Sequence, residues 1–208
     1  MPPASCPAAA DGTLDLADAA DAVGAAGAGV PADACVAWVL VALGSNVADP
    51  AAAVTLAARA VVARLQLHSA RCSRLWRTRP AESASGADFV NAVLLGRCAL
   101  APLEVLQRLQ AIERAFGRDR AHEGFHGPRP LDLDVLAAGD LLLDTAPLIL
   151  PHPRLHQRTF VLGPLAEIAP DWQHPRLGQS AASLWDACLS LTPHHGCTPV
   201  APSPLEVL

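Results

Sequence analysis

Hydrophobic and polar positions follow a strand pattern and then a helix pattern at the start of the ordered part of the chain. Residues 36–43 are almost all apolar and predict a buried strand, and residues 44–46 predict a turn. Asp49 and Pro50 then predict the N-cap and the first turn of a helix. Apolar residues recur at helical spacing and predict the inner stripe of this helix, which is Val54, Ala58, Val61 and Leu65.

Two strands and a second helix are expected next. The strands are predicted at about 70–78 and 88–98, on either side of a loop rich in Pro, Ser and Gly. The second helix is expected to begin near Pro102 and to end at Gly117. Its predicted inner stripe is Val105, Leu109, Ile112 and Phe116.

The remaining elements complete a recognisable order. Strands at about 131–137 and 141–144 are predicted, joined by a hairpin turn at 139–140, and helices follow at about 154–167 and 180–190. The order strand, helix, two strands, helix, strand predicts an α+β fold, a ferredoxin-like βαββαβ sandwich of one sheet with helices on one face. The additional β-hairpin and the C-terminal helices extend this sandwich.

Composition divides the 208 residues into three parts. Residues 1–35 are rich in Ala, Gly and Asp and predict a disordered leader, because they offer little apolar surface to bury. The leader holds five of the 20 acidic residues and no Arg or Lys, so the rest of the chain carries 15 acids and 15 basic residues. Residues 36–191 are the predicted folded domain, and residues 192–208 are predicted to be a flexible tail.

The neutral charge of the chain after residue 35 excludes a broad nucleic-acid footprint, which needs a surplus of cations facing phosphates. No run of about 18 strongly apolar residues predicts a membrane span, and no export signal is recognised at the start of the chain. We expect a cytoplasmic protein, a monomer, without nucleic-acid or membrane partners. All 15 basic residues are Arg, so phosphate contacts would use guanidinium groups.

The strongest candidates for chemistry are two acids, Asp132 and Asp134. On a strand their side chains project from the same face. Two carboxylates at that spacing can hold Mg²⁺ together with substrate phosphates. Three arginines lie on the loop that leads into the strand, and these are Arg118, Arg120 and Arg129. The combination favours a magnesium polyphosphate site, and the alternative is a half-exposed strand whose acids face water.

Phe89 and Asn91 lie two residues apart on a predicted strand and therefore face the same side. An aromatic ring beside an amide suits a flat heterocycle with hydrogen-bond donors and acceptors, and Phe160 in a later helix is the candidate second wall. The alternative is that Phe89 belongs to the core, as most aromatic residues in strands do.

His152 lies between two prolines, in an extended stretch that directs its ring reproducibly. It is a candidate phosphate ligand, with Arg158 as added positive charge, and the alternative is an ordinary surface histidine. Gln110 and Glu113 are three residues apart on the second helix and are expected to point together, opposite the apolar stripe. They are either functional or part of the solvated surface.

From about Val39 to Pro175 the chain resembles the 6-hydroxymethyl-7,8-dihydropterin pyrophosphokinase family. Five motifs in order, at nearly the spacing of the family, carry the resemblance. They are Ala42–Asn46, Asp88–Asn91, Gly117–Arg120, Gly127–Asp134, and Pro151–Arg154 with its continuation to Leu165. The fold that the resemblance implies is the ferredoxin-like fold predicted above.

The resemblance implies a reaction in which the diphosphate of ATP is transferred to the hydroxymethyl oxygen of the pterin. The products would be AMP and the pterin diphosphate, in a step of tetrahydrofolate biosynthesis. Asp132 and Asp134 would bind two Mg²⁺ ions that bridge the phosphates of ATP. The implied phosphate-gripping arginines are Arg118, Arg120 and Arg129.

The resemblance also implies two sets of binding residues. On the nucleotide side, Val135 would line the adenine pocket, and His152 and Arg158 would contact phosphates. The other implied nucleotide-side contacts are Gln110 and Glu113. The pterin would be held between two aromatic rings and a polar edge, at Thr78, Phe89, Asn91 and Phe160. The chain departs from the family at Arg79, where Pro is common. Phe125 and His126 are two candidates for a single aromatic position that packs over the ligand.

Three other interpretations remain open at this point. Another Mg²⁺-dependent nucleotidyl or phosphoryl transferase on the same fold would keep the paired acids but not the pterin pocket. An inactive relative would bind pterin and ATP as a sensor. An RNA-binding ferredoxin-like module would need more stacking aromatics beside basic residues than this chain has.

Overall fold

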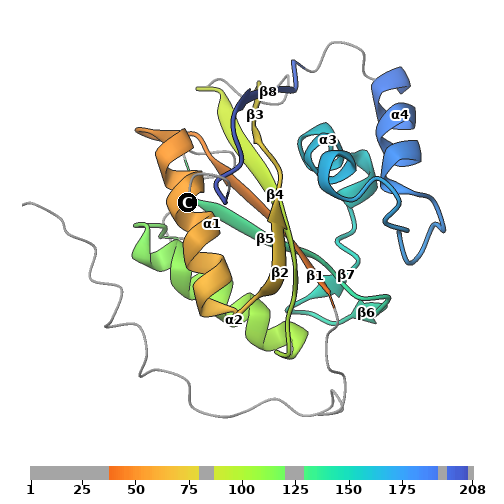
Figure 1. Ribbon diagram of the computed structural model, residues 1–208. Coiled ribbons are helices and arrows are strands. Elements are labelled where there is room, and N and C mark those ends of the chain that lie inside the picture. Colours follow the sequence, from red (N-terminus) through yellow and green to blue (C-terminus); the bar gives the residue numbers. More distant parts are fainter. Residues whose placement is uncertain (1–37, 80–86, 120–128, 192–195, 206–208) are drawn as a thin grey trace, which may run out of the picture.

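The structure, a computed structural model, describes residues 38–79, 87–119, 129–191 and 196–205. It has a mixed α/β fold in which one antiparallel sheet is packed against helices (Figure 1). The strands of this sheet are β1 (Val39–Ser45), β2 (His68–Cys72), β3 (Leu75–Thr78), β4 (Phe89–Arg97), β5 (Asp132–Ala138) and β8 (Thr198–Ala201). Their order is β5-β1-β4-β3-β8, and β2 also pairs with β4.

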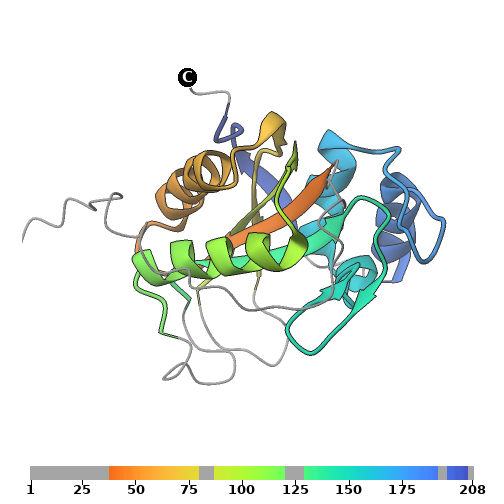
Figure 2. The same ribbon diagram turned by 90° about the horizontal axis from the view of Figure 1, so that it is seen from below.

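Helices cover both faces of the sheet (Figures 1 and 2). The helices are α1 (Pro50–Arg64), α2 (Pro102–Ala115), α3 (Thr159–Ile168) and α4 (Ala181–Leu191). Val39, Val41 and Leu43 of β1 face the core formed with α1 and α2, and the alternating residues Leu40 and Ala42 face the core formed with α3 and α4. The prediction of helices on one face is therefore wrong, because the apolar side of α3 packs on the opposite face of the sheet.

The first predicted helix is confirmed together with its cap. The backbone N–H of Ala52 donates to Asp49 Oδ1 at 3.0 Å, and Pro50 is the first helical residue. All four residues of its predicted stripe are buried. The stripe of α2 is also confirmed as far as Ile112, whereas Phe116 is only half-buried.

Several predicted boundaries differ from those of the structure. Gly44 and Ser45 belong to β1 and not to a turn, because both are paired with β4. The predicted strand at 70–78 is broken into β2 and β3 at Ser73, whose buried hydroxyl donates to Arg74 O and accepts the N–H of Val93. The helix predicted from about 154 begins at Thr159, after a 3₁₀ turn at Leu155–Gln157.

The predicted hairpin turn at 139–140 is present, but it does not join two paired strands. Gly139 has a φ of 52° and its N–H donates to Trp38 O at 2.7 Å, which ties the end of β5 to the entry of β1. The following strand β6 (Leu143–Asp144) pairs instead with β7 (Ile149–Leu150). The additional hairpin therefore exists one strand later than predicted, where the buried Leu150 supplies the apolar partner.

The sheet extends beyond the predicted end of the domain at residue 191. Thr198–Ala201 form β8, which pairs antiparallel with β3 and is the last strand on that side of the sheet. Part of the predicted C-terminal tail is therefore an edge strand. Among the helices of the described ranges, none has the length and apolar character needed to cross a membrane.

Candidate active site

The two predicted acids project from β5 on one face, as the alternation of a strand requires. Asp132 and Asp134 are half-buried, while Leu133 and Val135 between and after them are buried in the core against α1 and α2. β5 is the edge strand on the side of the sheet opposite β8. Both carboxylates therefore lie along one edge, within reach of the segments around them.

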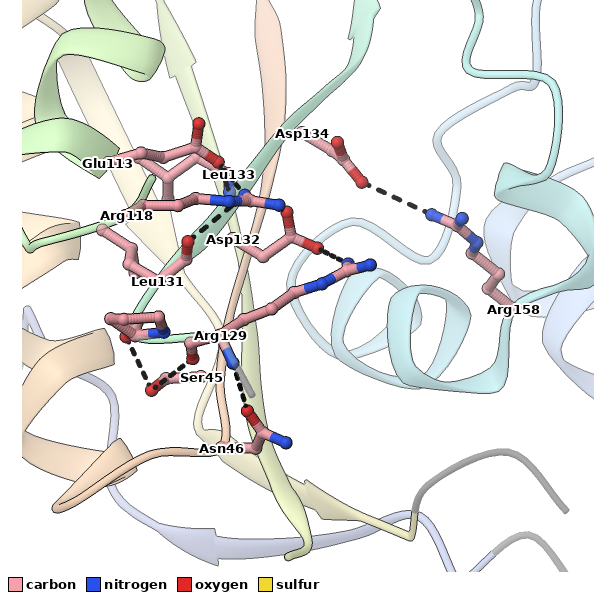
Figure 3. Close-up of polar contacts among 11 residues, drawn as sticks. Ser45, Asn46, Glu113, Arg118, Arg129, Leu131, Asp132, Leu133, Asp134 and Arg158 are labelled. Atoms are coloured by element: carbon pink, nitrogen blue, oxygen red, sulfur yellow. Dashed lines mark hydrogen bonds and ion pairs between the residues drawn. The ribbon is translucent and has the colours of Figure 1, made fainter. Parts of the chain in front are cut away.

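Asp132 is the centre of an arginine cluster (Figure 3). Arg129 Nη1 lies 2.7 Å from Asp132 Oδ2, and Arg118 Nη1 is paired with the other carboxylate oxygen. Burial alone would raise the pKa of Asp132, but the two guanidinium groups outweigh it and hold this pKa below its ordinary value. The carboxylate is therefore ionised and has a cation on each oxygen.

Glu113 lies behind this cluster and is 1% exposed. It is paired with Arg118, and its Oε1 accepts the backbone N–H of Leu133 at 2.8 Å. The prediction that Glu113 points away from the apolar side of the helix is wrong. Glu113 can turn inward because a guanidinium and a strand N–H satisfy its charge there.

The end of β1 fixes the backbone of Arg129. Asn46 Oδ1 accepts the N–H of Arg129 at 2.8 Å, and the N–H of Asn46 donates to Arg129 O at 3.3 Å. The buried Ser45 hydroxyl donates to Pro130 O at 2.8 Å. Sequence reasoning treated both residues as turn formers and missed this role, although two polar residues directly after an apolar strand were the available signal.

A cavity of about 300 Å³ lies beside Asp134. It brings together three of the predicted nucleotide-side residues, since Gln110, Val135 and His152 all line it. The rest of the lining is mostly apolar and comes from α2, β5 and the β6–β7 hairpin, at Leu106, Leu133, Ala146, Pro147, Leu148, Ile149 and Pro153. A cavity that combines apolar walls with several polar groups suits a small flat ligand.

His152 is held by the backbone on both sides. Its backbone N–H donates to Leu136 O at 2.8 Å, and its ring Nδ1 accepts the backbone N–H of Arg154 at 3.1 Å. Burial, with Arg158 and Arg154 nearby, lowers the pKa of His152, and Asp134 opposes this only in part. The ring is therefore neutral near neutral pH, and its proton is assigned to Nε2.

Arg158 connects the acids with the aromatic side of the site. Its Nη1 lies 3.4 Å from Asp134 Oδ2, and its Cζ lies 5.4 Å from the centre of the Phe160 ring. Figure 3 shows this guanidinium reaching from the α3 side toward β5. One cation therefore contacts both a predicted metal ligand and a predicted stacking residue.

The predicted polar edge of the pterin pocket is formed by two buried side chains. Asn91 Nδ2 donates to Thr78 Oγ1 at 2.8 Å, across the pairing of β4 with β3. Gly44 lies opposite Asn91 on β1, and a Cβ at this glycine would come within 2.8 Å of Asn91 Oδ1. Sequence reasoning missed Gly44, whose lack of a side chain gives the amide its space.

The two predicted aromatic walls lie on different elements. Phe89 is the first residue of β4, paired with Thr78, and Phe160 is the second residue of α3, which packs against β4. Both rings are half-buried. Arg120, Phe125 and His126 lie outside the described residues.

The family model of 7,8-dihydro-6-hydroxymethylpterin-pyrophosphokinase (HPPK) matches residues 40–170. The chain belongs to this family. The predicted family is thus confirmed. HPPK homologues transfer the diphosphate of ATP to hydroxymethyldihydropterin in folate biosynthesis, generally with Mg²⁺.

Two relatives carry the name 2-amino-4-hydroxy-6-hydroxymethyldihydropteridine pyrophosphokinase. The protein from Pseudomonas aeruginosa is 41% identical over 150 residues, which cover 72% of this chain and 91% of the relative. The protein from Synechocystis sp. is 45% identical over 129 residues, which cover 62% of this chain and 64% of the relative. The match therefore spans slightly less than two thirds of the Synechocystis protein.

The fold is also similar to solved structures. The crystal structure of Plasmodium falciparum HPPK-DHPS wild type with pteroate superimposes with a TM-score of 0.56 at 13% identity. The superposition covers 74% of this chain and 44% of the Plasmodium chain. At this identity the likeness concerns the fold alone.

Proposed function

We propose that this HPPK-family chain transfers the diphosphate of ATP to the hydroxymethyl oxygen of 6-hydroxymethyl-7,8-dihydropterin. The observation that carries the proposal is the arrangement around β5. Asp132 is paired with Arg118 and Arg129, Asp134 is paired with Arg158 and lines the cavity, and Arg158 also lies over the Phe160 ring. A polyphosphate with a heterocycle at each end fits such an arrangement of charges between two less polar sites.

Asp132 and Asp134 are the proposed ligands of two Mg²⁺ ions. The donor set fits, because Mg²⁺ prefers one or two carboxylates and takes its remaining ligands from phosphates and water. Within the described ranges no cluster of three or more His, Cys, Asp or Glu side chains could hold a metal ion. When bound, Mg²⁺ supplies positive charge that neutralises the phosphate oxygens.

The arginines provide the remaining electrostatic stabilisation. Arg118 and Arg129 are proposed to contact the phosphates of ATP, together with Arg120. Since both described guanidiniums are already paired with Asp132, binding of ATP would exchange a carboxylate for phosphate oxygens. Glu113 keeps Arg118 in place during this exchange, so its role is to position that arginine.

On the nucleotide side, Gln110 and Val135 are proposed to contact the adenosine part of ATP in the cavity that they line. His152 and Arg158 are proposed to contact its phosphates. The neutral His152 donates through Nε2, because its Nδ1 already accepts the N–H of Arg154. Arg158 contributes a permanent charge.

On the pterin side, Phe89 and Phe160 are proposed to stack on the two faces of the ring. Asn91 uses one of its two N–H groups on Thr78 and keeps its carbonyl oxygen and second N–H for the heterocycle. The pterin would thereby be held with its hydroxymethyl oxygen in line with the β-phosphorus. A bond forms between these two atoms, the bond from the β-phosphorus to the α–β bridging oxygen breaks, the hydroxyl proton is released, and AMP departs.

The ferredoxin-like description of the fold belongs to the same proposal. The order β5-β1-β4-β3, with α1 after β1 and α2 after β4, supports it. We further propose that the enzyme acts as a cytoplasmic monomer, with ATP and the pterin as its ligands and without nucleic-acid or membrane partners.

The test is an assay for AMP released from ATP and Mg²⁺, with and without 6-hydroxymethyl-7,8-dihydropterin. It is run on the wild-type chain and on the Asp132→Ala/Asp134→Ala double variant. We expect AMP only when the pterin is present, and only from the wild type. Binding of both ligands without AMP would instead favour a sensor, and binding of neither ligand would overturn the proposal.

A further inference from the structure

The C-terminal residues 196–205 lie beyond the family match, which ends at residue 170, and they are nevertheless built into the sheet. Thr198–Ala201 form β8 along the outer edge of β3 (Figure 1). Thr198 is paired with Arg77, one residue before Thr78 of the proposed pterin pocket. The segment therefore lies directly behind one part of that pocket.

The start of this segment also contacts both sides of the pocket. An added Cβ at Gly196 would lie 3.5–3.6 Å from the side chain of Arg79, the residue after Thr78. Cys197 Sγ lies 3.7 Å from the carbonyl oxygen of Thr159, the residue before Phe160. Of two consecutive residues, Gly196 thus lies beside the neighbour of a proposed polar contact, and Cys197 touches the neighbour of a proposed stacking ring.

The end of the segment is anchored in the core. Ser203 is buried, and its hydroxyl donates to Cys72 O at 2.9 Å. Leu205 packs against the core between the sheet and α1, and its N–H donates to Ser203 Oγ at 3.3 Å. The C-terminal end of the segment, which is the end farther from the pocket, is therefore held in the core. This attachment allows the first residues of the segment to support the pocket.

The contact at Thr159 supplements a separate attachment of α3 to β3. Toward its C-terminal end α3 is held by Glu167, which accepts the indole N–H of Trp76 at 2.8 Å, and by the close approach of Gly163 to the same ring. The N-terminal end of α3, which carries Phe160, has the contact with Cys197. The segment thus restrains the end of the helix that bears the proposed stacking ring.

We propose that residues 196–205 are a positioning element for the pterin subsite. They hold β3, with Thr78, and the start of α3, with Phe160, at a fixed separation. This inference rests on the proposed function. Most of the proposed nucleotide side lies along β5 at the opposite edge of the sheet, so the segment affects the affinity for the pterin more than that for ATP.

Gly196→Val in the full chain tests the proposal. Gly196 has a φ of 51°, and a valine there would strain the backbone and bring its side chain into contact with Arg79. Gly178→Val is the matched control, because Gly178 has a φ of 62° and nothing within 4 Å of an added Cβ. The two variants share the backbone strain, and only the first disturbs the segment.

We expect Gly196→Val to raise the KM for the pterin at least about fivefold, with the KM for ATP within about twofold of the wild type, and Gly178→Val to change neither. If Gly196→Val fails to fold, Cys197→Ala takes its place, with an expected increase of about threefold in the KM for the pterin. An unchanged KM for the pterin, or an equal rise for both substrates, overturns the positioning role. A wild type without pterin-dependent AMP formation overturns the proposed function and this inference together.

Discussion

The two halves of the proposed site are stabilised in different ways. Around β5 the site is built from charges, with Asp132 between two arginines and Asp134 next to a third. On the pterin side it is built from neutral groups, where a buried amide donates to a buried hydroxyl and a glycine leaves room for the amide. The charged half is thus held together by its own ion pairs, and the neutral half by the pairing of strands.

This difference indicates how each half meets its ligand. Phosphates that bind these arginines compete with the carboxylates that already accept their N–H groups, so the ion pairs hold the guanidinium groups at the site before ATP binds. The neutral half needs no such exchange, because strand pairing already places Asn91 and Thr78. Substitutions in the charged half should therefore affect the local charge and the reaction rate. Substitutions in the neutral half should affect the binding of the pterin.

The largest effect is expected from Asp134→Ala. Removal of this carboxylate should lower kcat at least about 100-fold, because it takes away a proposed metal ligand and the partner of Arg158. The rate of AMP formation at saturating substrates measures the effect. Asp144→Ala on the exposed β6 is the control, and a near-normal kcat in Asp134→Ala would contradict the metal assignment.

Glu113→Gln should mainly affect stability. The substitution leaves the buried Arg118 with one anion fewer, and we expect the free energy of unfolding to fall by about 3 kcal/mol. Urea unfolding measures this change. Glu104→Gln on the same helix removes an exposed partner of Arg108 and should cost less than about 0.5 kcal/mol. Equal losses in the two variants would show that Glu113 does not hold the cluster together.

Gly44→Ala tests the neutral half. The new Cβ would lie 2.8 Å from Asn91 Oδ1, so the amide must move, and we expect the KM for the pterin to rise about tenfold with little change in the KM for ATP. Gly96→Ala is the matched control, since Gly96 lies on the paired strand β4 and the atoms nearest to its added Cβ belong to the Leu67 side chain, at 3.1 Å. Equal KM values for the pterin in these two variants would remove Gly44 from the site.

The smallest effect is a dependence on pH that only the charged half should have. The pKa of Asp132 is held below its ordinary value of 3.8, so its ion pairs stabilise the fold above that value. This contribution is lost as the pH falls through the lowered pKa. The difference in unfolding free energy between the wild type and Asp132→Asn should therefore shrink with acidification, and a difference that stays constant would contradict the ion-pair account.

The parts of the fold that could be predicted depend on short-range patterns. Asp49 caps its helix because the cap lies three residues from the N–H that it accepts, and β5 places its two acids on one face because side chains alternate. These rules need only neighbouring residues. The general architecture followed from them, whereas the family was indicated by the resemblance of five motifs.

The parts that could not be predicted depend on partners far along the chain. Glu113 is buried because Arg118 and the N–H of Leu133 satisfy it, and helical spacing alone cannot indicate such partners. β8 forms because its residues pair with β3. β6 pairs with Ile149–Leu150, whereas the sequence pattern predicts that it pairs with β5. Gly44 matters only through the residue on the neighbouring strand. In each case the deciding contact is tertiary.

The position of Arg158 has a thermodynamic consequence. Its guanidinium contacts Asp134 on one side and lies over the Phe160 ring on the other. A ligand in either half that shifts this group changes the surroundings of the other half, and linkage requires the two effects on binding affinity to be equal. Cooperativity between the two substrates can thus arise from a single side chain, without any movement of the sheet.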